Sequence, residues 1–230
     1  MTGNPIFCAL DTTDPAAAAA LAGRLGGLVG GIKLGLEFFT ANGPDGVRQV
    51  MRDLPLPLFL DLKFHDIPNT VAGAVRGISG LAPSFTTIHA GGGAAMMRAA
   101  VEAAEGRTQI LAVTILTSLA QEDLPPLGIP GPVADQVRRL ADLAAQAGVD
   151  GLVCSPHEVA VLRAQIGPAL KLVVPGIRPA GSAADDQARV LTPKQAMAAG
   201  ADHLVIGRPI TASADPVAAA KAILASLERE

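Results

Sequence analysis

The chain has 230 residues, half of them hydrophobic, a formal net charge of −3 and a mean hydropathy of +0.39. This length allows one large α/β domain or two small ones. Charged residues recur between the apolar ones, which excludes a membrane span, and Lys and Arg are not clustered. With six Phe and no Trp or Tyr there is little aromatic surface for bases. We therefore expect no membrane and no nucleic-acid partner.

The location of the protein is predicted from its first residues and its cysteines. The N-terminus lacks a basic segment followed by a cleavable apolar one. Cys8 and Cys154 are far apart in apolar segments, with no Cys or His at metal-ligand spacing. We interpret them as buried, reduced thiols, and we predict a cytoplasmic protein.

Eight short apolar segments have the composition of buried parallel strands. They cover residues 6–10, 31–34, 58–62, 85–89, 110–115, 151–154, 172–174 and 204–206. Ala- and Leu-rich segments with helical spacing separate them, so that each strand–helix unit takes roughly 29 residues, the size of a βα repeat.

Helix boundaries are marked by capping residues and glycines. A capping residue precedes Pro at Asp14, Ser155, Thr192 and Asp215, and Glu158 completes a predicted capping box with Ser155. Glycines at 26–27, 106, 148 and 200 precede the next strands. No linker divides the chain, so we predict one domain over residues 1–230, an α/β fold with a single parallel eight-stranded (β/α)8 TIM barrel.

A doubly wound open sheet is the alternative fold. The segment after the first predicted strand, Asp11 to Asp14, lacks the glycine fingerprint that dinucleotide-binding sheets of that type carry.

Polar residues end most of the predicted strands, where barrel enzymes carry their active sites. They are Asp11, Lys33, Asp61, Lys63, His89, Thr114, Thr117, Arg178 and Arg208. Strand side chains alternate, so Phe59, Asp61 and Lys63 share one face. We expect Asp61 and Lys63 to pair in the barrel mouth, either as a structural ion pair or, with Lys33 on the next strand, as a functional array.

Two segments indicate a phosphate site. Gly207 and Arg208 follow the last strand, the usual phosphate position of this fold, and combine an approachable backbone with a guanidinium. Residues 176–191 are rich in small and polar residues and carry Arg178, Gln187 and Arg189. They form either a loose insertion or, as we interpret them, a lid that closes over the phosphate.

Motifs along nearly the whole chain resemble the orotidine 5'-phosphate decarboxylase family. They are Ala9-Leu-Asp11, Ile32-Lys-Leu-Gly35, Asp61-Leu-Lys-Phe-His-Asp-Ile-Pro-Asn-Thr70, His89-Ala-Gly-Gly92, Leu116-Thr-Ser118, Val174-Pro-Gly-Ile-Arg-Pro179, Asp186-Gln187, Thr192-Pro193 and Ile206-Gly-Arg-Pro-Ile210. The resemblance implies decarboxylation of orotidine 5'-phosphate to uridine 5'-phosphate, the last step of pyrimidine nucleotide synthesis, with no metal or other cofactor.

The resemblance also implies roles for individual residues. Lys33, Asp61, Lys63 and Asp66 would form a catalytic array in which Lys63 protonates a carbanion at C6 of the pyrimidine. Asp11 and Lys33 would hold the ribose. The phosphate would be held by Gln187, Gly207 and Arg208. Thr117 would lie near the base and the lid, and Arg178 would also face the ligand. We call residues 61–70 the substrate segment, because the resemblance implies that all of them contact the substrate. Its other members are Leu62, Phe64, His65, Ile67, Pro68, Asn69 and Thr70. For His65 and His89 a purely structural role is the alternative.

A homodimer with shared active sites is a further implication of the resemblance. In the family, Asp66, Ile67 and Thr70 reach into the neighbouring subunit's site. Two other functions stay open from the residues alone. One is a Mg²⁺-dependent sugar-phosphate decarboxylase or aldolase, although Lys33 occupies the place of its acidic metal ligand and Glu37 lies beyond it. The other is a non-catalytic nucleotide-binding barrel.

Overall fold

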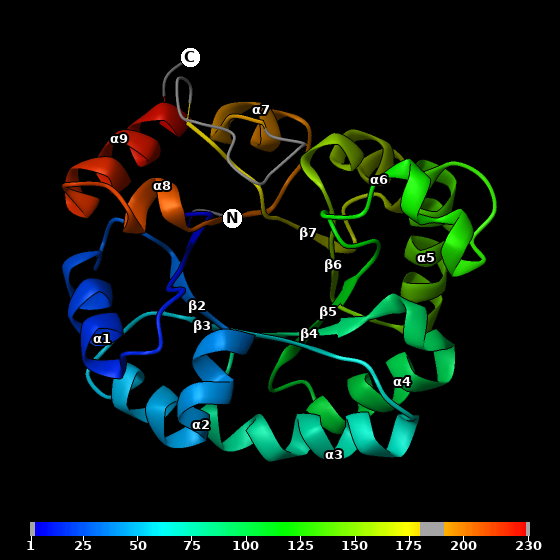
Figure 1. The fold of residues 1–230 in the computed structure, drawn as a ribbon, viewed down its shortest axis with the longest axis horizontal. Helices are drawn as coiled ribbons and strands as arrows, with labels where there is room; N and C mark the ends of the chain where they lie inside the picture. The colour runs from blue at the N-terminus through cyan, green and yellow to red at the C-terminus, as the bar shows by residue number, and fades with distance from the viewer. Residues whose placement is uncertain (1–2, 180–190, 229–230) are drawn as a thin grey trace.

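The computed structural model describes residues 3–179 and 191–228, and its strands form a closed barrel in sequential order (Figure 1). Each strand pairs in parallel with both neighbours, and the last pairs with the first. The strands are β1 (Ile6–Ala9), β2 (Gly31–Gly35), β3 (Leu58–Phe64), β4 (Phe85–His89), β5 (Gln109–Val113), β6 (Gly151–Val153), β7 (Lys171–Val174) and β8 (His203–Ile206). The predicted barrel is confirmed, and the open sheet is wrong.

Helices surround the barrel in Figure 1 and connect successive strands. They are α1 (Pro15–Arg24), α2 (Leu36–Met51), α3 (Pro68–Ile78), α4 (Gly93–Ala104), α5 (Val133–Ala147), α6 (Val159–Ile166), α7 (Pro193–Ala198), α8 (Arg208–Thr211) and α9 (Pro216–Glu228). Short 3-10 turns lie at η1 (Ser79–Leu81), η2 (Ala90–Gly92), η3 (Gln121–Asp123), η4 (Pro125–Leu127) and η5 (Pro156–Glu158). Within the described ranges, no helix combines the length and the apolarity that crossing a membrane requires.

The predicted capping residues begin the helices as expected, with one exception. Asp14 accepts hydrogen bonds from the backbone at the start of α1, Asp215 does so at α9, and Thr192 forms a reciprocal capping box with Gln195 at α7. At Ser155 only half of the predicted box forms. The Glu158 carboxylate accepts from the Ser155 N–H at 2.8 Å, whereas the buried Ser155 hydroxyl has no hydrogen-bond partner among the described residues.

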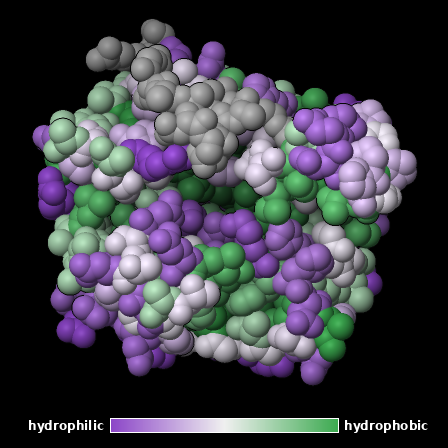
Figure 2. All heavy atoms as spheres, in the orientation of Figure 1, coloured by the Kyte–Doolittle hydropathy of each residue, from purple (hydrophilic) through white to green (hydrophobic). Residues whose placement is uncertain are grey.

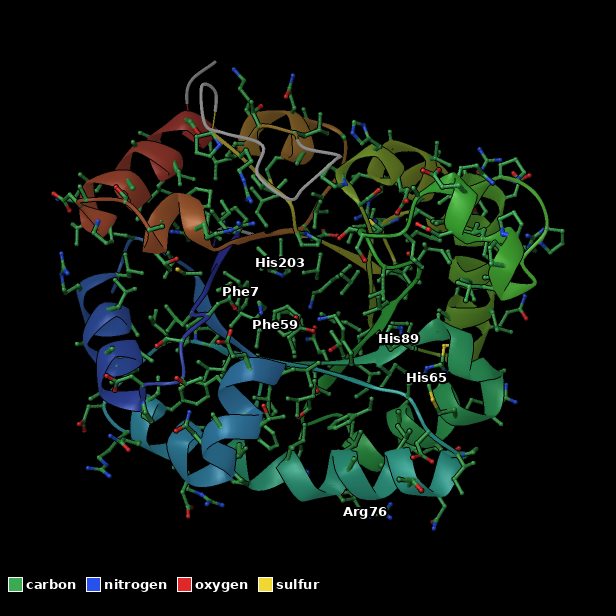
Figure 3. All side chains as sticks on the ribbon, viewed as in Figure 1. Phe7, Phe59, His65, Arg76, His89 and His203 are labelled. Atoms are coloured by element: carbon green, nitrogen blue, oxygen red, sulfur yellow. The ribbon has the colours of Figure 1, made fainter. Side chains whose placement is uncertain are left out.

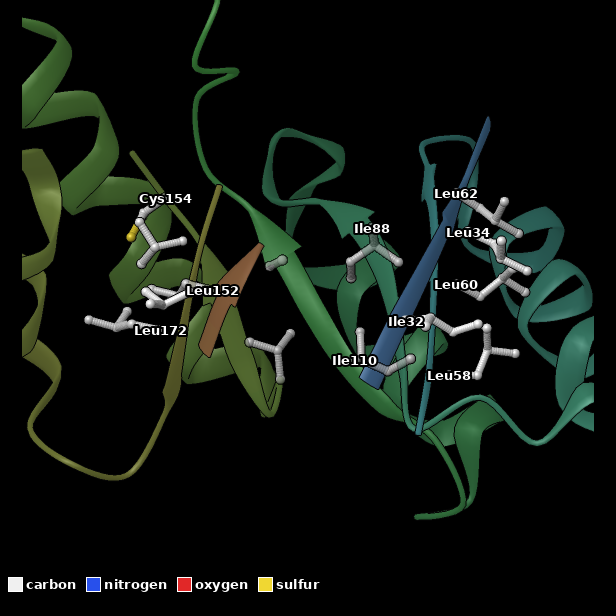
Figure 4. Packing of buried hydrophobic residues seen from close by; sticks show 14 of the residues in the cluster. Ile32, Leu34, Leu58, Leu60, Leu62, Ile88, Ile110, Leu152, Cys154 and Leu172 are labelled. Atoms are coloured by element: carbon white, nitrogen blue, oxygen red, sulfur yellow. The ribbon is translucent and has the colours of Figure 1, made fainter. Parts of the chain in front are cut away.

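Strand alternation divides the core into two layers. Outward side chains such as Leu58, Leu60 and Ile32 pack against the helices (Figure 4). Inward side chains fill the barrel with a smaller cluster that includes Phe7 and Phe59, whose rings meet edge to face at 6.0 Å. Figure 3 shows both rings inside the barrel. This cluster fills the barrel interior below the cavity that opens at the carboxyl ends of the strands.

Candidate active site

Four charged side chains, from β2, β3 and the segment that follows β1, form a line of alternating charge at the barrel mouth. Lys63 Nζ lies 2.9 Å from both carboxylate oxygens of Asp61. Lys33 Nζ lies 3.4 Å from Asp61 Oδ2 and 3.7 Å from Asp11 Oδ1. The side chains of Lys33 and Asp61 are only 12% and 13% exposed, so mutual pairing offsets the cost of desolvating their charges. The predicted pairing of Asp61 with Lys63 and its approach to Lys33 are present.

The charge of Asp61 is stabilised by its neighbours. Burial alone would raise the pKa of this carboxyl, but the Lys33 and Lys63 ammonium groups and hydrogen bonds from Lys63 and Thr87 outweigh it. The net result is a pKa below the usual 3.8. Asp61 is therefore ionised at neutral pH, where it can hold the Lys63 ammonium in one orientation.

The backbone of Lys63 departs from ordinary strand geometry. Its φ is +48°, in the left-handed region that non-glycine residues seldom adopt. The departure lies within a register shift, since β3 advances from Leu60 to Phe64 while β4 advances only from Thr86 to Ile88. The Lys63 N–H donates to the Thr87 hydroxyl at 2.8 Å. Simple alternation predicted the direction of the Lys63 side chain but not this bulge.

A cavity of about 230 Å³ opens above the charged line. Its wall includes the whole line and four further residues predicted as ligand contacts, namely Thr117, Arg178, Gly207 and Arg208. Figure 2 shows hydrophilic side chains gathered in a hollow at the centre of this face. Residues that were predicted on or after β1, β2, β3, β5, β7 and β8 thus line one cavity.

The residues that line this cavity differ in exposure and charge. The side chains of Lys33 and Asp61 are largely buried, whereas Asp11 is exposed and lies near Gly207, which begins the turn into α8 with the exposed Arg208. A Cβ atom at Gly207 would lie 3.4 Å from Asp11 Oδ2, so the Gly207 backbone lies close to the Asp11 end of the line. Arg178 is 8% exposed and lines the same wall. The two guanidinium groups on this wall suit a ligand that carries an anionic group.

Part of the predicted substrate segment lies elsewhere. Leu62 packs into the outer core and Phe64 packs against it, because their positions alternate with those of the inward residues. The segment 65–70 is exposed and does not line the cavity. Within it the Asp66 carboxylate accepts from the Ile67 N–H at 2.6 Å, and Ile67 is 66% exposed. Within the described part of one chain, the structure does not bring Asp66, Ile67, Pro68, Asn69 and Thr70 into the site.

His65 and His89 face each other beside the cavity, with ring centroids 5.2 Å apart (Figure 3). The pKa of His89 lies below its usual 6.5 because of burial first and then the positive charges of His65 and Lys63, against an opposing effect of Asp61. A neutral His89 next to Lys63 adds no competing charge. Gln187 and Arg189, with most of the predicted lid, lie outside the described residues.

One residue that contacts the charged line was missed in the sequence. Thr87, fully buried on β4, donates to Asp61 Oδ1 at 2.8 Å. The alternation of β4 carries the signal, since Phe85, Thr87 and His89 share the inward face. In the described ranges, no three His, Cys, Asp or Glu side chains gather where they could hold a metal ion, and Glu37 is exposed outside the cavity wall.

A closed parallel barrel with a charged cavity at the carboxyl ends of its strands is the architecture of a (β/α)8-barrel enzyme. Residues 4–223 match the family model described as "Orotidine 5'-phosphate decarboxylase / HUMPS family". The chain belongs to this family, as the sequence motifs predicted.

Similar proteins with this fold and sequence are known from several bacteria. The orotidine 5'-phosphate decarboxylase of Paramagnetospirillum magneticum is 58% identical, over 97% of this chain and 98% of its own length. That of Rhodospirillum rubrum is 57% identical, over 97% and 94%. A crystal structure of orotidine 5'-phosphate decarboxylase from Lactobacillus acidophilus has a TM-score of 0.86 and 36% identity, covering 98% of this chain and all of that one.

Proposed function

We propose that the chain decarboxylates orotidine 5'-phosphate to uridine 5'-phosphate, with Lys63 as the proton donor to a carbanion at C6. The chain is an enzyme, a carboxy-lyase of pyrimidine nucleotide synthesis, as its relatives are. The observation that carries the finer scheme is the Lys63 ammonium, held by both oxygens of an ionised Asp61 on the cavity wall. A fixed cation at that point stabilises negative charge that develops next to it.

The bonds, electrons and protons of the reaction balance with Lys63 as the proton donor. The bond between C6 and the carboxylate breaks, CO2 departs, and the electron pair stays on C6. Lys63 then gives one proton from its ammonium to C6, which forms the C6–H bond of the product, and the neutral amine takes a proton back from solvent. Asp61 acts first as a positioning group for Lys63. The scheme uses no metal and no organic cofactor.

Binding is assigned to the remaining wall of the cavity. Asp11 and Lys33 would hold the ribose hydroxyls, and Gly207 and Arg208, with Gln187 from outside the described residues, the phosphate. Thr117 would lie near the base and Arg178 near the ligand. In this proposal each chain is one domain, residues 1–230, that works in the cytoplasm, and residues 176–191 close over the phosphate.

The proposal includes a homodimer with shared sites and no nucleic-acid or membrane partner. Its support is the position of Asp66, Ile67 and Thr70, which are exposed at the end of β3 and the start of α3. An isoleucine that is 66% exposed beside an acidic site residue is suited to burial against a second chain. In the dimer, Asp66 would complete the charged array of the partner's site.

A turnover assay in excess EDTA tests this function. We expect loss of the orotate chromophore at the same rate with and without EDTA, and loss of that activity in Lys63→Ala. Lys221→Ala, which removes an exposed lysine of α9, is the matched control. Activity that disappears with EDTA and returns with Mg²⁺ would establish the metal-dependent alternative. Binding of the nucleotide without turnover by the wild type would leave a non-catalytic barrel, and an active Lys63→Ala would remove Lys63 from its role.

A further inference from the structure

Thr87 connects the two central residues of the site through a single oxygen atom. Its side chain points into the barrel from the middle of β4 and is fully buried. The Thr87 Oγ1 lies 2.8 Å from the Lys63 backbone nitrogen and 2.8 Å from Asp61 Oδ1. One hydroxyl on β4 therefore touches both charged partners on β3.

The direction of these two hydrogen bonds follows from the chemistry of the groups. A backbone N–H can only donate, so the Thr87 oxygen accepts from Lys63. An ionised carboxylate can only accept, so the single hydroxyl proton of Thr87 goes to Asp61. The chain of donation runs from the Lys63 N–H through Thr87 to Asp61, and each step strengthens the other. A side chain without a hydroxyl breaks both bonds at once.

The Lys63 backbone needs such a partner because of the register shift. Between Leu60 and Phe64 the strand leaves the regular ladder, and Thr87 is the residue of β4 opposite this bulge. A non-glycine residue at positive φ costs on the order of 1 to 3 kcal/mol and persists only where its surroundings hold it. The Thr87 hydroxyl supplies the acceptor that the Lys63 N–H lacks in the ladder.

We propose that Thr87 is a positioning residue for the decarboxylation, whose hydroxyl fixes the Lys63 backbone in its left-handed conformation and orients the Asp61 carboxylate that holds the Lys63 ammonium. The proposal rests on the proposed function and deepens it. Lys63 then presents its proton at one point of the cavity, because its backbone and its ammonium are both anchored to the same small cluster.

The charged surroundings of Asp61 define what a change at Thr87 does to its titration. Lys33 faces it from β2, Lys63 from β3 and His89, whose pKa is lowered, from β4. Asp11, which follows β1, interacts with Lys33. The Thr87 hydrogen bond is one of the contributions that keep the Asp61 pKa low. Without it, Asp61 takes up a proton at higher pH and releases its hold on Lys63.

Three variants test the proposal. Thr87→Val keeps the shape and removes the hydroxyl, Thr87→Ser keeps the hydroxyl, and Thr86→Val is the matched control. Thr86 is also fully buried and also loses one hydrogen bond, to the Leu60 carbonyl at 2.9 Å, but it points to the outer layer. We expect Thr87→Val to lower kcat about 10- to 100-fold, with a smaller change in KM. Thr87→Ser and Thr86→Val should stay within about threefold of the wild type in kcat.

The pH profile separates positioning from mere stability. In Thr87→Val the acid limb of kcat should move up by about one pH unit, while Thr86→Val keeps the wild-type limb. Equal kcat and equal acid limbs in Thr87→Val and the wild type would overturn the proposal. So would a Thr86→Val variant that loses as much kcat as Thr87→Val.

A carbon NMR titration of the Asp61 carboxyl, without substrate, keeps this test independent of turnover. A higher Asp61 pKa in Thr87→Val than in the wild type supports the positioning role, and an unchanged pKa contradicts it. If the wild type fails to decarboxylate the nucleotide, the proposed function fails while the titration still decides the role of Thr87. Thr87→Ala replaces Thr87→Val in every measurement if thermal melting shows that the valine variant does not fold.

Discussion

The ammonium of Lys63 lies 2.9 Å from each of the two carboxylate oxygens of Asp61, although both side chains leave the same strand. Because Lys33 approaches the same carboxylate at 3.4 Å, Asp61 is the one negative charge between two positive ones. The Asp61 carboxylate thus offsets the mutual repulsion of the two ammonium groups.

Asp61→Asn should therefore disable the enzyme. The amide keeps the size of the side chain but removes the negative charge between Lys33 and Lys63, so the two ammonium groups repel each other and Lys63 is free to turn. We expect kcat to fall by about 100-fold or more, measured by decarboxylation of orotidine 5'-phosphate. Asp45→Asn removes the charge of a side chain that is 94% exposed and should leave kcat unchanged. An Asp61→Asn enzyme within about tenfold of the wild type would show that its charge is dispensable.

Arg208→Ala tests the phosphate end of the cavity. We expect kcat/KM for the nucleotide to fall about 10- to 100-fold, which corresponds to the free energy of one hydrogen bond to a charged group. The reason is that binding energy from the remote phosphate helps to organise the reacting end of the substrate. The nucleoside that lacks the phosphate should be affected far less. Arg48→Ala, on the exposed face of α2, is the control. If both substrates lose the same factor, Arg208 does not bind the phosphate.

The sequence predicted the barrel because each strand carries its own local signal. The segment 85–89 was predicted with the bounds that β4 has, and the other strands differ by one or two residues at their ends. Apolar β-branched residues, helix caps and glycines act within a few residues of chain, so they can be recognised without a structure. The same local reasoning placed Asp61 on the inward face.

The details of the site required the structure because they depend on two strands at once. The positive φ of Lys63 comes from the mismatch of β3 and β4, and nothing in the sequence around a lysine indicates it. Thr87 has its role only because that mismatch places it opposite Lys63. Asp66 and Ile67 are exposed in the single chain. Whether they enter a partner's site depends on a second chain, so an experiment on the dimer must test it.

Mixing inactive variants tests the shared site. Lys63→Ala and Asp66→Ala chains should each be inactive, but a mixed dimer contains one complete site with Lys63 from one chain and Asp66 from the other. Random exchange of equal amounts should restore about one quarter of the wild-type activity. A mixture of Lys63→Ala with Lys33→Ala is the matched control, because both residues belong to the same chain's contribution, and it should remain inactive. Equal results from the two mixtures would refute the shared site.

His203 should make the stability of the fold depend on pH. Its ring packs against Phe7 at 5.4 Å and Phe85 at 5.3 Å inside the barrel (Figure 3), and its Nδ1 has no hydrogen-bond partner among the described residues. Burial first and Lys171 second lower the pKa of His203 below its usual 6.5, against Asp202 and a hydrogen bond to the Pro5 backbone.

The sign of the effect follows from the direction of this shift. The folded state favours the neutral ring, so the contribution of His203 to stability is complete above the unfolded pKa of 6.5 and is lost as the pH falls from there through the lower folded pKa. Urea unfolding at about pH 8 and about pH 5.5 measures it. We expect His203→Gln to lose less stability on acidification than the wild type, since His89 and the carboxylates titrate in both. His157→Gln, an exposed control, should keep the wild-type dependence. An identical loss in His203→Gln and the wild type would mean that the buried ring is already free to take up its proton in the folded barrel.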